Sequence, residues 1–246
     1  MTALSVNLNK LALLRNSRGH NAPDLLHYAK RFIELGVQGI TIHPRPDERH
    51  ITQQDAYELA HLLRGFPRVE FNIEGYPSEA FLQLVERCKP TQCTLVPDAE
   101  DQLTSDHGWD FTQHLDTLKP IIQRLKKAGV RVAVFLDPDI EQIELTAQSG
   151  TDRIELYTEE FASEFSSNKA KDVLNKYQVA AILAQKLGLG VNAGHDLNLK
   201  NLPSFLSIPD ILEVSIGHAL IIECIDHGIE KVVSDYLSIC KGICKV

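Results

Sequence analysis

Histidines, arginines and carboxylates cluster at the ends of short apolar stretches of this sequence. His43, Arg45 and His50 follow the first such stretch rich in β-branched residues, and Glu74 ends the next one. Imidazole transfers protons near neutral pH, and burial raises the pKa of a carboxyl group, which makes it a stronger base. Arginine binds phosphate or carboxylate through paired hydrogen bonds. These residue types indicate acid–base chemistry on an anionic substrate.

Two Gly-His pairs end later apolar stretches. Gly194-His195 lies in the sequence VNAGHDL, and Gly217-His218 lies in SIGHAL. A glycine lets the backbone approach an anion closely, and barrel enzymes often bind phosphate with N–H groups from the loops that follow their last two strands. His195 is also suited to donate a proton. The pairs predict a second anion site.

The elements that would position these residues alternate regularly. Short apolar stretches predict eight strands, at 4–8, 39–43, 70–74, 92–96, 131–137, 153–158, 189–194 and 212–217, with helical patterns between them. This alternation implies parallel strands, and eight of them usually close into a barrel. We therefore expect one (β/α)8 TIM barrel with extra helices over residues 1–246. An open doubly wound sheet is the alternative, although no G-x-G-x-x-G follows the first strand.

The alternation within each strand predicts a polar barrel interior. Residues i and i+2 of a strand share one face, and the faces opposite the apolar ones carry Ser5, Asn7 and Asn9; Thr41 and His43; Asn72 and Glu74; and Glu155 and Tyr157. Barrel interiors are normally filled by branched apolar side chains. Burying polar groups without partners costs several kcal/mol, so this pattern favours a catalytic site over a structural network.

Several features leave alternatives open. His43, Glu74, Glu155 and His195 could bind a metal, but their spacing matches no metal motif and Arg45 would oppose a dication, so we expect no metal site. The segment 97–110 is either a lid or an exposed loop. The segment 159–188 predicts a loop and a helix with one additional short helix.

The roles of two further arginines stay open, and two aspartates are expected to have a structural role. Arg15 and Arg18 could bind an anion or lie in solvent, whereas Asp137 and Asp139 are expected to cap a helix.

Composition restricts the function classes. The formal net charge of −8 argues against a nucleic-acid partner. The sequence contains no apolar run long enough to span a membrane. Its five cysteines form no C-x2-C pair, which favours reduced thiols in the cytoplasm over zinc or disulfides.

The sequence resembles the pyridoxine 5'-phosphate synthase family over nearly its whole length. The resemblance rests on VNLNKLALLRNSRG, GITIHPRPDERHIT, FNIE, LVPD followed by LTSDHGWD, VNAGHDL and SIGHA. It implies a (β/α)8 barrel that assembles into an octamer, a tetramer of dimers. It also implies condensation of 3-amino-2-oxopropyl phosphate with 1-deoxy-D-xylulose 5-phosphate, which gives pyridoxine 5'-phosphate, inorganic phosphate and water without a cofactor.

The same resemblance implies roles for individual residues. His43 and Glu74 would accept protons and His195 would donate one. The deoxyxylulose phosphate would be bound by Arg45, His50 and Thr104, and the aminoketone phosphate by Asn7, Arg18, Asp196, Gly217 and His218. Many members have Asp-His where this chain has Asn9-Lys10, a pair assigned to the deoxyxylulose substrate. Asn9 can form hydrogen bonds but cannot act as a base, and Lys10 adds a positive charge.

Two other functions compete with this one. A metal-dependent sugar-phosphate epimerase or isomerase could use the same fold, and so could a non-catalytic protein that binds phosphorylated ligands. Dependence on a metal ion would identify the first, and a lack of turnover would identify the second.

Overall fold

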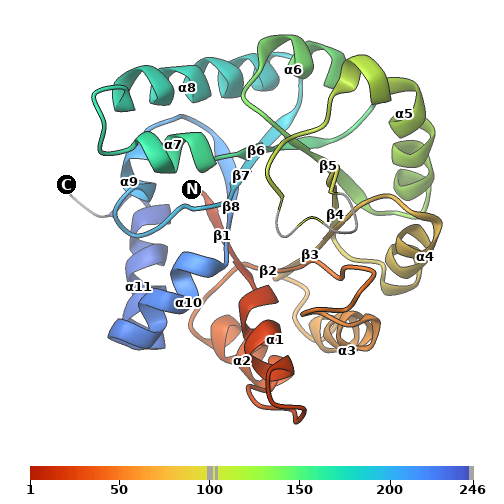
Figure 1. Cartoon of the computed structure of the whole chain (residues 1–246), viewed down its shortest axis with the longest axis vertical. Helices are drawn as coiled ribbons and strands as arrows, with labels where there is room; N and C mark the ends of the chain where they lie inside the picture. The colour runs from red at the N-terminus through yellow and green to blue at the C-terminus, as the bar shows by residue number, and fades with distance from the viewer. Residues whose placement is uncertain (99–101, 103–104, 244–246) are drawn as a thin grey trace.

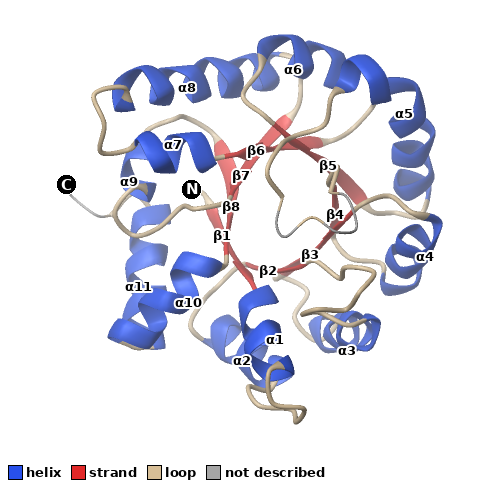
Figure 2. Cartoon of the chain, in the orientation of Figure 1, coloured by secondary structure: helices blue, strands red, loops and turns tan. Residues whose placement is uncertain are grey.

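Eight parallel strands form a closed barrel in the order β1 to β8. The structure is a computed structural model that describes residues 1–98, 102 and 105–243. Its strands are β1 (Ala3–Asn7), β2 (Gly39–Ile42), β3 (Glu70–Gly75), β4 (Gln92–Leu95), β5 (Arg131–Leu136), β6 (Arg153–Tyr157), β7 (Gly190–Gly194) and β8 (Ile211–Ile216). They surround the centre of the molecule, with the helices outside them (Figures 1 and 2). The barrel prediction is confirmed, with no strand end displaced by more than one residue.

The helices include the expected extra ones. Helices α2 (Leu25–Glu34), α3 (Gln53–Leu63), α4 (Glu79–Cys88), α5 (Phe111–Lys127), α6 (Ile140–Thr146) and α8 (Ala170–Lys186) connect successive strands. Helices α1 (Asn9–Asn16), α7 (Glu159–Glu164) and α9 (Leu202–Phe205) are short additions before α2, before α8 and after β7. Helices α10 (His218–His227) and α11 (Ile229–Cys240) follow β8. The short helix expected within 159–188 is α7.

Side chains at the helix N-termini explain where several helices begin. Asp24, Thr52, Ser78 and Asp110 each accept a hydrogen bond from a backbone N–H in the first turn of α2, α3, α4 and α5. Such caps satisfy N–H groups that lack a partner within the helix.

The two expected caps near β5 differ in role. Asp139 caps α6, as expected. Asp137 does not, because its carboxylate accepts from the Gly108 N–H at 3.0 Å. It therefore holds the segment before α5 against the end of β5.

The apolar core lies between the barrel and the helices. The outward-facing residues of the strands are fully buried there, including Ile40 and Ile42 of β2, Val132 and Val134 of β5, and Ile154 and Leu156 of β6. The opposite strand faces are thereby directed into the barrel.

Inside the barrel, polar side chains form hydrogen bonds with one another. Ser5 pairs with Thr41 at 2.7 Å, Thr94 donates to Asn72 at 3.0 Å, and Asn192 donates to Gln92 at 3.4 Å. The polar interior expected on β1, β2, β3 and β6 therefore extends to β4 and β7. The same i, i+2 alternation is visible in the sequence at Gln92 and Thr94.

One strand boundary changes the interpretation of the site. Asn9 was expected to continue the inward face of β1, but β1 ends at Asn7 and Asn9 opens α1. The side chain of Asn7 accepts from the Asn9 N–H at 2.9 Å, which turns the chain at the strand end. Lys10 therefore also lies on a helix.

No helix in the described part of the chain is long and apolar enough to cross a membrane.

Candidate active site

A cavity of about 500 Å³ opens at the carboxyl end of the barrel. Parallel-strand barrels place their active sites at this end. The predicted residues that line it are Asn7, Asn9, Lys10, His43, Arg45, His50, Glu74, His195, Asp196, Gly217 and His218. Residues from β1, β3 and the loops after β2, β7 and β8 thus meet around one space, as expected for a single site.

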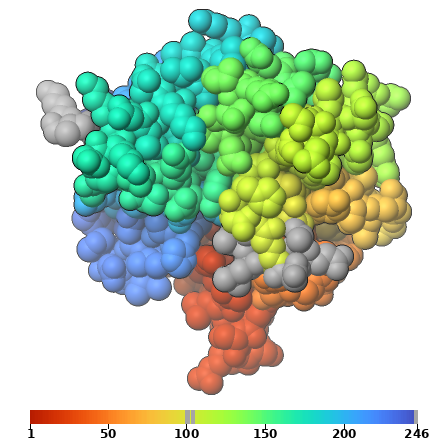
Figure 3. Space-filling model, turned by 45° about the horizontal axis from the view of Figure 1, so that its top comes forward, coloured from red at the N-terminus to blue at the C-terminus, as the bar shows by residue number. Residues whose placement is uncertain are grey.

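Two predicted ligands are not among these lining residues. Arg18 is exposed in the connection between α1 and α2, which extends away from the barrel (Figures 1 and 3). The structure therefore does not bring Arg18 to this cavity. Thr104 and part of the expected lid lie outside the residues that the structure describes.

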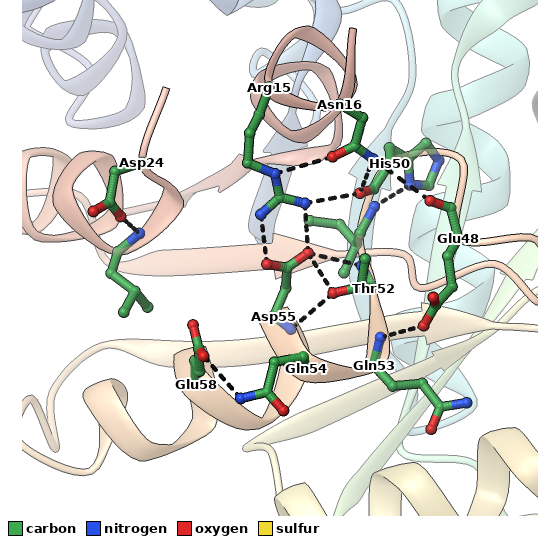
Figure 4. Close-up of polar contacts among 12 residues, drawn as sticks. Arg15, Asn16, Asp24, Glu48, His50, Thr52, Gln53, Gln54, Asp55 and Glu58 are labelled. Carbon is green, nitrogen blue, oxygen red and sulfur yellow. Dashed lines mark hydrogen bonds and ion pairs between the residues drawn. The ribbon is translucent and has the colours of Figure 1, made fainter. Parts of the chain in front are cut away.

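The loop after β2 is held by a cluster of polar contacts with α1 and α3 (Figure 4). Arg15 donates to both carboxylate oxygens of Asp55, at 2.5 and 2.8 Å, and to the His50 carbonyl at 3.2 Å. Asp55 also forms a capping box with Thr52 at the start of α3. Arg15 therefore supports the backbone beside His50 without itself lining the cavity.

His43 and His50 lie near each other, with ring centroids 6.3 Å apart. Burial, reinforced by the charge of Arg45, holds the pKa of His43 well below its usual value. The same two causes lower the pKa of His50 to about 4. Both imidazoles are therefore neutral at physiological pH, the form that can accept a proton.

Arg45 is buried in a short ion pair with Asp98. It also donates to the Gln102 carbonyl at 3.0 Å, and Ser105 donates to Asp98 at 2.8 Å. A buried pair of this kind fixes the plane of the guanidinium group. Arg45 thus presents a positive charge of defined orientation to the cavity.

The carboxyl groups of half-buried Glu74 and buried Glu155 both line the cavity. The pKa of Glu74 is raised well above its usual value by burial and by the neighbouring charge of Glu155. Burial and the charge of Glu213 raise the pKa of Glu155 to about 8. At neutral pH Glu155 therefore holds a proton, and the raised pKa of Glu74 makes its ionised form a stronger base than an ordinary carboxylate.

His195 is held in an unusual backbone conformation. Its φ is 79° and that of Asp196 is 55°, a left-handed conformation that is strained for residues other than glycine. The Thr158 hydroxyl donates to the Gly194 carbonyl at 2.7 Å and to that of His195. The His195 ring packs edge-on against Tyr157, with centroids 5.1 Å apart. Burial lowers the pKa of His195.

Sequence reasoning did not assign some of the lining residues to the site. The sequence pattern places Glu155 and Tyr157 on the inward face and offers Glu155 only as a possible metal ligand, while Ser215 is not among the predicted site residues. The signal available for all three was their alternation with apolar residues. Among the described residues, no group of three or more His, Cys, Asp or Glu side chains could hold a metal ion.

Comparison with known proteins identifies the family. Residues 4–242 match the family model described as pyridoxal phosphate biosynthesis protein PdxJ. The chain belongs to the PdxJ family. It is 51% identical over 242 residues to the pyridoxine 5'-phosphate synthase of Christiangramia forsetii, with 98% of this chain and 100% of that one covered. The synthase of Flavobacterium johnsoniae is 52% identical over 238 residues, which cover 96% and 98% of the two chains.

Solved structures outside the family share its fold. The tryptophan synthase alpha chain of Legionella pneumophila superposes with a TM-score of 0.67 at 12% identity, covering 100% of this chain and 94% of that one. A phosphoribosylanthranilate isomerase of Thermotoga maritima gives a TM-score of 0.58 at 12% identity, covering 98% and 100% of the two chains. At such identities the likeness concerns the fold alone, and the PdxJ family match concerns the whole chain.

Proposed function

We propose that this chain is a pyridoxine 5'-phosphate synthase. It condenses 3-amino-2-oxopropyl phosphate with 1-deoxy-D-xylulose 5-phosphate to pyridoxine 5'-phosphate, inorganic phosphate and water. The observation that carries the proposal is the cavity in which His43, Glu74 and His195 meet beside Arg45, in a chain that matches the PdxJ family over residues 4–242.

The proton-transfer roles follow from the protonation states. Neutral His43 accepts protons released during the dehydrations, and Glu74 does so in its ionised form. The amine that forms the first imine belongs to the substrate, so the reaction needs no lysine from the enzyme. His195 donates a proton to a leaving oxygen. Bound phosphate dianions would raise the pKa of His195 and so favour its charged form.

Two phosphorylated substrates require two anion sites. Arg45 and His50, together with Asn9 and Lys10 beside them, form the first, for the deoxyxylulose phosphate, and Thr104 is proposed to complete it. Asn7, Asp196, Gly217 and His218 form the second, for the aminoketone phosphate. In this second site, Gly217 precedes α10, so its first turn offers backbone N–H groups to an anion. Arg18 is retained as a proposed ligand of this site, although it lies outside the cavity lining of one protomer.

The direct test is to mix the purified protein with both substrates and follow pyridoxine 5'-phosphate by its absorbance and by mass. Omitting either substrate should abolish the product. Absence of product under all conditions would refute the proposal and favour a non-catalytic binder. Loss of activity on chelation, with a stoichiometric divalent ion in the protein, would favour a metal-dependent isomerase instead.

We further propose that the protein is a cytoplasmic homo-octamer. Support comes from the family resemblance and from large apolar side chains left exposed on α1 and α10, namely Leu13, Leu14, Ile222 and Ile225. An octamer of 27.5 kDa chains is readily distinguished from a dimer by light scattering. A monomer at micromolar concentration would contradict this assembly.

A further inference from the structure

The N–H group of His43 has an unusual partner. It donates to the side-chain oxygen of Asn9 at 2.9 Å. His43 lies just beyond the end of β2, and Asn9 is the first residue of α1. A side chain of one element thus holds the backbone of another at the position of a proposed catalytic base.

The strand ladder explains why this bond is needed. The last backbone bond between β1 and β2 runs from the Leu8 N–H to the Thr41 carbonyl, at 3.0 Å. If the parallel ladder continued, the His43 N–H would donate next to the Leu8 carbonyl. That carbonyl instead accepts from the Ala12 N–H at 3.0 Å, in the first turn of α1. The Asn9 side chain replaces the carbonyl that the helix has taken.

The side chain of Asn7 in turn holds the backbone of Asn9. Its side-chain oxygen accepts from the Asn9 N–H at 2.9 Å, which fixes the turn from β1 into α1. Two asparagine side chains therefore link β1, α1 and the end of β2 in sequence. Without the second link, the His43 N–H would be left without a partner in a largely buried place, which costs free energy.

We propose that Asn9 is a positioning residue, which holds the backbone of His43 so that the imidazole points into the cavity, rather than only a ligand of the substrate. The expected effect on catalysis rests on the proposed function, whereas the hydrogen bond between Asn9 and His43 does not.

The charge of the side chain at position 9 also affects the pKa of His43. An aspartate could accept the same hydrogen bond but would bring a negative charge to His43. The charges that act on the His43 ring are those of Arg45, Arg49 and His50 from the loop after β2 and of His195 after β7. The same cavity is also lined by Lys10 from α1, Glu74 from β3 and Glu155 from β6. Because the cations in this set favour neutral imidazole, a new carboxylate would oppose them and raise the pKa of His43.

Two substitutions separate these effects. Asn9→Ala removes the acceptor, so we expect kcat to fall by about tenfold to a hundredfold, since small displacements of a catalytic group have effects of this size. Asn9→Asp keeps the acceptor, so we expect kcat at high pH to stay within a few-fold of wild type. In this variant the acid limb of kcat/KM should move to higher pH, because His43 must be neutral to act.

The same strand pair offers a matched control. At the opposite end of β1 and β2, the Gln38 side chain accepts from the Leu4 N–H at 3.0 Å. Gln38→Ala removes the same kind of bond far from the cavity. We expect it to lower thermal stability about as much as Asn9→Ala, while kcat and the pH profile stay unchanged.

A second measurement does not depend on catalysis. Amide hydrogen exchange of His43, followed by NMR, should accelerate about tenfold in Asn9→Ala and remain slow in Asn9→Asp. A wild-type protein that forms no product would refute the proposed function, and this exchange would still test the contact. The inference is overturned if Asn9→Ala retains kcat within twofold, if Asn9→Asp is as impaired as Asn9→Ala at every pH, or if exchange is unchanged.

Discussion

Burial has opposite effects on the acids and bases of this cavity, and both effects favour the neutral form. It lowers the pKa values of His43 and His50 and raises those of Glu74 and Glu155. The imidazoles are thus left neutral near pH 7, Glu155 holds a proton, and ionised Glu74 becomes a stronger base than an ordinary carboxylate. One physical cause prepares both halves of an acid–base site.

Glu74→Gln tests the carboxylate that is proposed to accept a proton. The amide is nearly isosteric but cannot exchange a proton, so kcat should fall by about 10²-fold or more, while KM for both substrates changes little. Glu70→Gln is the control, since Glu70 begins the same strand and pairs with Arg131. Steady-state measurement of kcat and KM for both variants tests this expectation. Turnover of Glu74→Gln at the wild-type rate would remove Glu74 from the mechanism.

Arg45 has two roles that can be separated. Arg45→Gln leaves Asp98 buried without its partner, which should destabilise the protein by about 3–5 kcal/mol. It should also raise KM for the deoxyxylulose phosphate by about tenfold to a hundredfold, the value of a lost charge-assisted hydrogen bond. The double variant Arg45→Gln/Asp98→Asn should regain most of the stability but none of the affinity. If the double variant regained both the free energy of unfolding and the wild-type KM, the two roles would not be separable.

The residues that sequence reasoning located best are those that lie at the carboxyl end of a strand or directly after it. His43, Glu74 and His195 could be assigned because parallel strands in a barrel end at one rim. Asp98 and Thr158 could not, since their roles depend on contacts with Arg45 and with the His195 loop that join distant elements. The role of Asn9 was also hidden, because it depends on where β1 stops.

At the scale of elements, the close approach of β7 to β6 limits what position 194 can hold. A Cβ atom on Gly194 would lie 2.3 Å from a carboxylate oxygen of Glu155. Glycine is therefore needed here for space, although the neighbouring His195 is the residue with positive φ. The strand alternation was predictable, whereas this contact was not, because it requires the register between the two strands.

Gly194→Ala should consequently push the Glu155 carboxyl out of place. We expect a loss of about 1–3 kcal/mol of stability, as for other overpacked sites, together with a fall in kcat. Gly65→Ala is a suitable control, because its Cβ would meet only the Leu62 carbonyl, at 3.3 Å. Urea denaturation and kinetics would be compared for the two. A folded Gly194→Ala enzyme with wild-type kcat would show that Glu155 tolerates displacement.

At the scale of the whole molecule, the barrel interior contains two groups of charged side chains. Around the cavity lie the proposed catalytic groups. At the amino ends of the strands, Glu70 pairs with Arg131, and Arg153 donates to Asn192 at 3.1 Å and lies 3.8 Å from Glu213. Polar residues on inward faces were interpreted from the sequence as a sign of catalysis. That reasoning could not distinguish the second group, which lies at the end of the barrel opposite the cavity.

Glu213 links this interior to the pH dependence of stability. Burial and the nearby charge of Glu70 raise its pKa from 4.5 to about 7. The folded protein therefore holds this proton more tightly than the unfolded chain. The resulting stability is fully present below pH 4.5 and is lost as the pH rises through about 7. Over that range the loss amounts to up to about 3 kcal/mol.

Glu213→Gln should remove this dependence. The difference in unfolding free energy between variant and wild type should rise in favour of the variant from pH 5 to pH 7 and then level off, beside a constant offset from the altered contact with Arg153. Contributions from the histidines are common to both proteins and cancel in the difference. Glu79→Gln is the control. It removes an exposed carboxyl whose pKa is about 2 in the wild-type protein, so its stability curve should run parallel to that of wild type above pH 5. Urea denaturation at several pH values measures all three. A Glu213→Gln curve that is also parallel to wild type would mean that this carboxyl titrates in the folded protein as it does in the unfolded chain.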